Sequence, residues 1–253
     1  MRRESHVQFC ERPGVQLLRP TLPVTWNGMG IPLLWMVLST AGNSNTSERT
    51  ELLDRLRAAF PDMKIAALMG DREFIGDAWM AYLQHEKIPF ILRLRENQHV
   101  LRAGYAAMPI SVIAQHLKVG DKMILKGSCW LGRDNNTLSA SVRLVMMRLA
   151  SGELLALACS GRARHALARY RQRWTIETMF GNLKTKGFAL EATHLTDPNK
   201  LCTLLALLAF AVTLTVKTGA PACHSHQNTR PPCLVPVRSR SAHVSQNLRR
   251  RKS

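Results

Sequence analysis

The segment YRQRWTIETMFGNLK, at residues 170–184, decides how the rest of the chain is interpreted. Four of its apolar residues have the spacing of a helix that packs on a core: Ile176, Met179, Phe180 and Leu183. Tyr170, Glu177 and Lys184 recur every seven residues, which nearly returns to the same face of a helix. Arg173 stands four residues before Glu177, one turn away. The segment predicts a helix with one buried face and another face on which an acidic group lies between two cations.

A solvated helix face with one ordinary ion pair would have a similar charge spacing. The order of the residues favours a more specific interpretation. The segment contains, in this order, Tyr, two residues, Arg, three residues, Glu, six residues and Lys. This order and spacing resemble the YREK signature of insertion-sequence transposases with a DDE active site. In that family the Glu is the third metal-binding carboxylate, and the Tyr, Arg and Lys contact DNA phosphates. The resemblance thus assigns Glu177 to the metal, and Tyr170, Arg173 and Lys184 to DNA.

A second segment resembles the same family. Residues 64–69 (KIAALM) predict a short buried strand, and a helix is expected at 76–86. Asp71 follows the end of the strand, where ligand-binding groups gather in α/β sheets. The second catalytic Asp of the family often stands in an Asp-Arg-Glu context, as Asp71 does here, and we take Arg72 as a further candidate DNA contact. Read alone, Asp71 could simply cap a helix.

The order of the elements predicts an α/β fold. Further strands are expected at 31–38 and 89–95, and a further helix at 47–60. This alternation is typical of parallel strands with helices on the sheet faces. Strands at 122–130, 138–149 and 153–160, separated by turn signals, indicate an antiparallel meander. The pattern is compatible with the RNase H-like mixed sheet of the family, flanked by helices, with an inserted antiparallel β-rich subdomain.

Trp130, near a turn of this insertion, could stack on an unpaired base, although a core tryptophan is the more frequent role. Residues 201–216 are an uncharged apolar run that is short for a membrane span, and we expect a helix buried on all sides. We divide the chain into five segments: an atypical N-terminal segment at 1–23, the first part of the catalytic domain at 24–96, the β-rich insertion at 97–160, the second part at 161–217 with the Glu helix and the buried apolar helix, and a basic tail at 218–253 that should be disordered.

Composition favours a polyanionic partner. The formal net charge is +18, and without the eight Lys and Arg from residue 217 onward 27 basic residues still face 17 acidic ones. Six cysteines without a C-x-x-C pair, and no signal-peptide pattern, predict a cytoplasmic protein. The resemblance implies a bacterial, nucleoid-associated enzyme that acts on element ends and target DNA, as a homodimer when active and without a membrane.

The resemblance also implies two-metal chemistry with Mg²⁺ or Mn²⁺, in which water cuts the element end and the freed 3′-hydroxyl attacks target DNA. One carboxylate of this chemistry is missing. The family's first Asp lies on the strand that opens the fold, ahead of residues 24–32, but this chain has no Asp before Asp54. Glu11 precedes Arg-Pro-Gly, which predicts a turn.

We therefore expect impaired catalysis, and our hypothesis is a transposase remnant produced by truncation or an altered reading frame. Two alternatives remain. One is a non-catalytic DNA-binding protein, and the other is a different RNase H-like nuclease, which would cleave DNA without joining an end to a target.

Overall fold

The computed structural model describes residues 5–8, 21–26, 29–36, 44–132, 140–181, 183, 193, 195 and 197–223. Four of the features singled out in the sequence lie outside these residues: Lys184, the turn after Glu11, the turn at 133–136 and the tail beyond Cys223.

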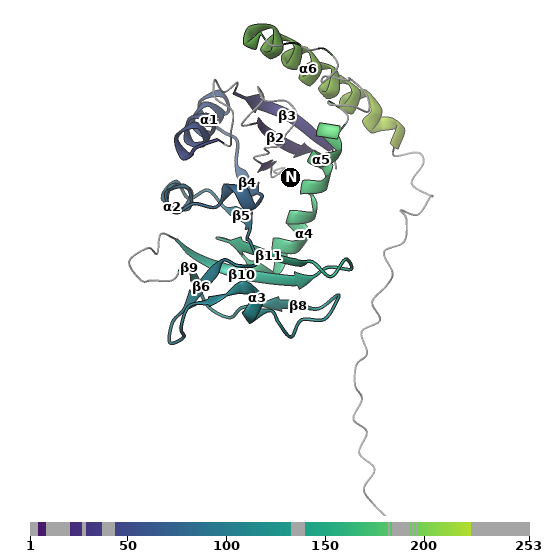
Figure 1. Ribbon diagram of the computed structural model, residues 1–253. Coiled ribbons are helices and arrows are strands. Elements are labelled where there is room, and N and C mark those ends of the chain that lie inside the picture. The colour runs from purple at the N-terminus through teal and green to yellow at the C-terminus, as the bar shows by residue number, and fades with distance from the viewer. Residues whose placement is uncertain are drawn as a thin grey trace, which may run out of the picture. The chain divides into compact units, whose positions relative to one another are not determined.

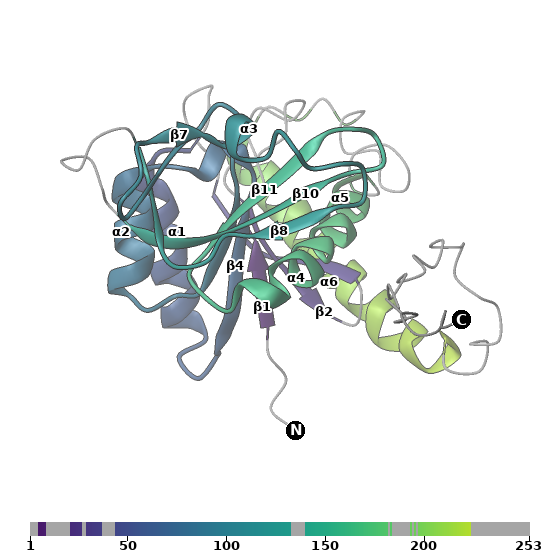
Figure 2. The same ribbon diagram turned by 90° about the horizontal axis from the view of Figure 1, so that it is seen from below.

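Five strands form the first half of a mixed sheet: β1 (Ser5–Gln8), β2 (Thr21–Trp26), β3 (Met29–Trp35), β4 (Ile65–Gly70) and β5 (Phe90–Arg93). Their spatial order is β3-β2-β1-β4-β5. β2 pairs antiparallel with both β1 and β3, and β4 runs parallel to both β1 and β5. β1 thus lies inside the sheet between β2 and β4 (Figure 2). This arrangement is RNase H-like and confirms the predicted fold class.

Six further strands extend the sheet: β6 (His99–Arg102), β7 (Met108–Pro109), β8 (Lys122–Ile124), β9 (Cys129–Leu131), β10 (Ser141–Arg148) and β11 (Leu154–Cys159). All their pairings are antiparallel, and β11 pairs directly with β5. The β-rich segment therefore continues the central sheet. The strand predicted at 122–130 is two strands, because the chain turns at Gly127, whose φ of +82° suits glycine.

Helices cover both faces of the first half of the sheet (Figure 1). On one face lie α1 (Thr46–Ala59) and α2 (Asp77–His85), whose leucines and Trp79 pack in one cluster with Leu68, Phe90 and Leu92. A capping box starts α1, since Asn45 and Glu48 each accept a hydrogen bond from the other's backbone N–H. The helix α3 (Ile110–Ile113) connects β7 to β8. The short 3₁₀ turns η1 (Arg72–Phe74) and η3 (Ala163–His165) each connect a strand to the next helix, η1 after β4 and η3 after β11.

The opposite face carries α4 (Ala166–Arg171) and α5 (Arg173–Gly181). The strand residues Ala67, Met69 and Ile91 alternate with those that face α1 and α2, and they pack with Tyr170. α5 lies across β2 and β3, where Gly30 permits a close approach. A Cβ atom at Gly30 would be 3.2 Å from the backbone of α5 at Thr175 O and Ile176 Cα.

The last helix, α6 (Pro198–Cys223), is not buried on all sides, so that prediction was wrong. Three leucines one helical turn apart, Leu201, Leu205 and Leu208, pack with Ile176, Met179 and Leu183 around α5. A second stripe of large apolar residues is exposed, with Leu207 at 63%, Phe210 at 65% and Leu214 at 46%. The run Asn199–Thr218 is long and apolar enough to span a membrane by length and composition alone. The helix continues to Cys223, so the first residues of the expected tail are helical.

Candidate active site

Asp71 stands at the carboxyl end of β4, where Gly70 makes the turn into η1 possible. A Cβ atom at Gly70 would be 2.8 Å from Leu92 Cδ2 and 2.9 Å from Phe74 Cβ, too close for any other residue without a rearrangement. Asp71 Oδ1 accepts a hydrogen bond of 2.9 Å from the backbone N–H of Arg72, so this residue does cap the turn. Its second oxygen, Oδ2, is left for another partner.

That partner is Arg173, which is 102 residues away in the chain. Arg173 Nη2 donates to Asp71 Oδ2 at 2.8 Å, and Arg173 Nη1 donates to Glu177 Oε1 at 2.9 Å. One guanidinium thus joins the carboxylates of Asp71 and Glu177. The Arg173 side chain is 11% exposed, while those of Asp71 and Glu177 are 35% and 30% exposed. The two acidic side chains are therefore open to solvent, with the cation beneath them.

Tyr170 lies next to this group but inside the protein. It is 7% exposed and packs with the strand residues under α4. The Arg173 guanidinium carbon is 5.9 Å from the centroid of its ring. Burial, with the negative charges of Asp71 and Glu177, raises the pKa of the Tyr170 phenol to about 12, although Arg173 and Arg93 oppose the shift. Its hydroxyl group has no hydrogen-bond partner among the described residues.

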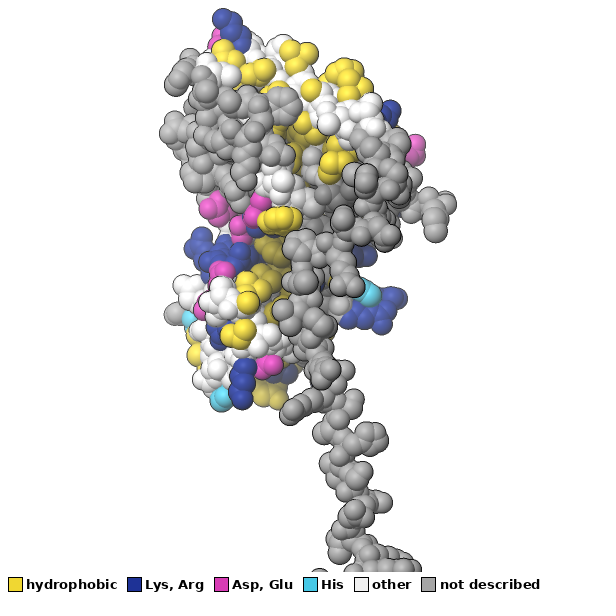
Figure 3. Space-filling view, turned by 90° about the vertical axis from the view of Figure 1, so that its right-hand side faces the viewer, with side chains coloured by type: hydrophobic (Ala, Val, Ile, Leu, Met, Phe, Trp, Pro, Cys, Tyr) yellow, Lys and Arg dark blue, Asp and Glu magenta, His cyan; other side chains and the backbone are white. Residues whose placement is uncertain are grey.

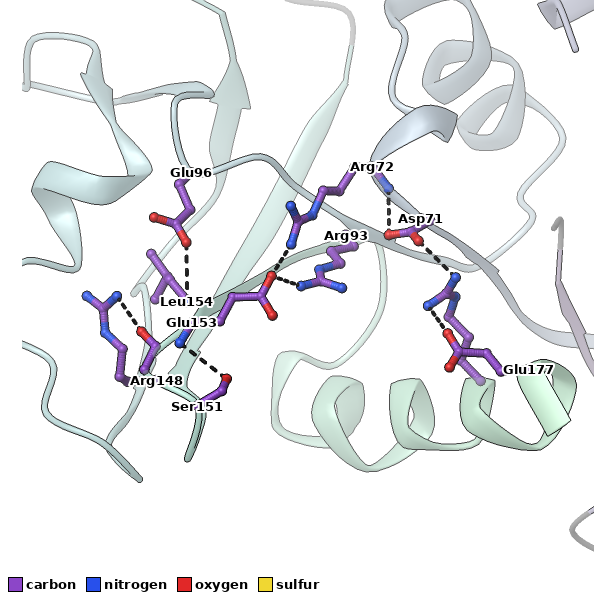
Figure 4. Close-up of polar contacts among 11 residues, drawn as sticks. Asp71, Arg72, Arg93, Glu96, Arg148, Ser151, Glu153, Leu154 and Glu177 are labelled. Carbon is purple, nitrogen blue, oxygen red and sulfur yellow. Dashed lines mark hydrogen bonds and ion pairs between the residues drawn. The ribbon is translucent and has the colours of Figure 1, made fainter. Parts of the chain in front are cut away.

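A second charged group, formed by Arg72, Arg93 and Glu153, lies beside Asp71 (Figure 4). Arg72 Nη2 and Arg93 Nη2 both donate to Glu153 Oε1, the latter at 2.5 Å. Figure 3 shows basic and acidic side chains gathered midway along one face of the molecule. Sequence analysis identified Arg72 but missed Arg93 and Glu153. The available signal for Arg93 was its position near the end of the strand predicted at 89–95, whereas nothing local to Glu153 marked it.

Trp130, the remaining candidate DNA contact, lies within β9 rather than in a turn. Its backbone pairs with Leu101 of β6 and Ser141 of β10, and its side chain is half-buried. Its proposed stacking on a base stays a prediction.

The ligand chemistry of the site suits a hard divalent cation, which prefers carboxylate oxygens such as those of Asp71 and Glu177. Among the residues that the structure describes, no three or more His, Cys, Asp and Glu side chains are arranged so that they could hold a metal ion. The neighbouring strand β1 pairs with β4 so that Gln8 is opposite Met69, two residues before Asp71. Its sequence, Ser-His-Val-Gln, contains no carboxylate. Asp71 and Glu177 thus meet at the Arg173 guanidinium, and β1 supplies no third carboxylate beside them.

Comparison with known proteins supports one family. The family model for the transposase DDE domain matches residues 24–214. A solved structure with a similar fold is the cryo-EM structure of a piggyBac transposase synaptic complex with hairpin DNA. It matches with a TM-score of 0.40 and 13% identity, over 71% of this chain and 40% of that chain. No curated protein matches the sequence. The family match covers most of the chain and includes both Asp71 and Glu177, and the chain belongs to the transposase DDE domain family.

Proposed function

We propose that this chain is the catalytic domain of a DNA transposase. Such an enzyme cleaves phosphodiester bonds at the ends of an element and joins the freed ends to target DNA. The observation that carries the proposal is the meeting of Asp71 and Glu177 at the Arg173 guanidinium. Both carboxylates stand at the positions that the DDE and YREK motifs assign to metal ligands. Membership of the transposase DDE domain family supports this assignment.

In this proposal Asp71 and Glu177 would hold Mg²⁺ or Mn²⁺, whose chemistry when bound would be Lewis-acid activation of the phosphodiester and of water. Arg173 holds the two carboxylates in place through two charge-assisted hydrogen bonds and offsets their mutual repulsion. The surplus of basic residues attracts the DNA backbone, so the affinity should fall steeply with salt. Two copies of the chain would bring two element ends together on the bacterial nucleoid.

The sequence of β1 favours a second candidate, a DNA-binding protein that has lost catalysis. A missing member of a catalytic group can remove nearly all of the rate enhancement. Because β1 lies beside β4 without a carboxylate, we expect cleavage by this chain to be weak. Both candidates predict DNA binding, and only the first predicts metal-dependent cleavage.

The test measures nicking of supercoiled plasmid DNA in Mn²⁺, together with binding to a labelled duplex at low salt. Asp71→Asn and Glu177→Gln remove one charge each and conserve shape, and Asn caps a turn as well as Asp does. Glu86→Gln is the matched control, because Glu86 also pairs with an arginine, Arg57, at the end of α2. Loss of nicking in the two site variants alone supports the transposase. Binding without nicking in the wild type supports the second candidate, and absence of DNA binding overturns both.

A further inference from the structure

Arg72 and Arg93 reach the same edge of the sheet from two neighbouring strands. β4 and β5 are parallel, and Gly70 pairs with Leu92. Arg72 comes two residues after Gly70, and Arg93 comes directly after Leu92. Parallel strands that end together place their following side chains at one edge, which in α/β folds is where ligands bind. Arg72 and Arg93 therefore lie at the same edge of the sheet as Asp71 (Figure 4).

Glu153 is brought to these arginines by a hairpin. The turn between β10 and β11 is closed by hydrogen bonds from Leu149 N to Glu153 O, at 2.8 Å, and from Gly152 N to Leu149 O, at 2.9 Å. Gly152 has a φ of +83°, which suits glycine. The next residue, Leu154, donates its N–H to Glu96 Oε1 at 3.3 Å. The backbone on both sides of Glu153 is thus fixed, and its carboxylate is directed to the arginines.

The carboxylate of Glu153 satisfies these arginines only in part. Both donate to one oxygen, Oε1, and the three side chains together carry a formal charge of +1. Arg93 Nε is buried and has no hydrogen-bond partner among the described residues. The Arg93 side chain is 16% exposed, whereas those of Arg72 and Glu153 are about 40% exposed, at 39% and 41%. An oxyanion with more oxygens could take the place of Glu153 from the solvent side.

We propose that Arg72 and Arg93 bind a backbone phosphate of DNA beside Asp71, and that Glu153 occupies this pair when DNA is absent. Guanidinium groups suit phosphate, which accepts several hydrogen bonds at once. Glu153 then competes with DNA and weakens its binding. The inference rests on the proposed function, because it names where the DNA backbone enters the site.

The experiment measures the affinity for a short labelled duplex by fluorescence anisotropy over a series of salt concentrations. Glu153→Gln should raise the affinity about threefold to tenfold, since it releases two partly exposed arginines from ion pairs. Glu86→Gln changes the net charge equally and frees Arg57 from a similar pair, so it gives the effect of charge alone. Arg72→Gln and Arg93→Gln should each lower the affinity and reduce the slope of log K against log salt by about 0.9.

The outcomes separate this inference from the proposed function. Absence of DNA binding by the wild type refutes the proposed function itself. The inference is wrong if the wild type binds DNA but Glu153→Gln has the same DNA affinity as Glu86→Gln, or a lower one. In that case the contacts of Glu153 with the two arginines only stabilise the fold. Thermal unfolding of each variant shows whether the substitution has destabilised the fold. Arg72→Gln should destabilise the fold less than Arg93→Gln, because the Arg72 side chain is more exposed. A gain in Glu153→Gln that disappears when Arg72→Gln is added supports the phosphate site.

Discussion

At the scale of single residues, Tyr170 has a phenol whose charged form the protein disfavours. Its ring packs among Ala67, Met69 and Ile91, while its pKa responds to Asp71, Arg93, Arg173 and Glu177. The pKa is raised to about 12, mainly by burial. The folded chain therefore holds the phenolic proton more tightly than the unfolded chain does. This contribution to stability is present below about pH 10, the unfolded pKa, and is lost as the pH rises toward 12.

We expect Tyr170→Phe to raise the free energy of unfolding by about 1 kcal/mol at pH 8, because the buried hydroxyl has no partner among the described residues. The variant should also lose less stability than the wild type between pH 10 and 12. Urea unfolding at pH 8 and pH 11 measures both effects. Tyr105→Phe, at a residue that is 57% exposed, is the control. A loss of stability in Tyr170→Phe would mean that the hydroxyl has a partner, and a loss of DNA affinity alone would support the phosphate contact implied by the YREK motif.

At the scale of the elements, α5 is placed by its contact with β3. The strand passes beneath the helix at Gly30, and Thr25 Oγ1 on β2 lies 3.4 Å from Thr175 Oγ1. The residues of α5 that approach Gly30, Thr175, Ile176 and Met179, lie on both sides of Glu177 in the chain. The position of this carboxylate relative to Asp71 thus depends on how closely a helix backbone can approach a strand.

Gly30→Ala should lower the free energy of unfolding by about 1 to 3 kcal/mol, because the added methyl group meets backbone atoms of α5 that cannot rotate away. The helix would be displaced and the Arg173–Asp71 ion pair strained. Thermal unfolding measures the loss, with Gly161→Ala as the control, because a Cβ atom at Gly161 has nothing within 4 Å. Equal melting temperatures for the two variants would contradict the close packing.

At the scale of the whole molecule, some contacts could be predicted from the sequence and others could not. The ordered YREK positions and the buried strand before Asp71 predicted that Asp71 and Glu177 share one site. Both side chains do pair with Arg173, while their role as metal ligands stays a prediction. The Glu153 contacts could not be predicted, because they depend on β11 pairing with β5. The exposure of Phe210 was missed because an apolar run does not tell which of its faces finds a partner.

The strand β1 was missed for a related reason. Four residues, Ser-His-Val-Gln, show no pattern of their own, and they form a strand because β2 and β4 flank them on both sides. Three distant segments therefore meet where the chemistry is expected: β1, the end of β4, and α5. The end of β4 is followed by Asp71 and α5 contains Glu177, whereas β1 lies beside β4 without a carboxylate.

Position 8 is where a carboxylate on β1 would restore the set. Gln8 pairs with Met69, which belongs to the face of the sheet that packs under α4, and Asp71 comes two residues later on that face. We expect Gln8→Asp to tighten Mn²⁺ binding, measured by calorimetry, and to raise plasmid nicking at least about tenfold, since a complete catalytic group gains more than its members do singly. His6→Asp adds the same charge opposite Ala67, farther from Asp71, and should have a smaller effect. The gain must also vanish in the double variant with Glu177→Gln. A folded Gln8→Asp protein with unchanged Mn²⁺ affinity would show that β1 does not face the metal ligands, and would leave DNA binding as the function that the sheet supports.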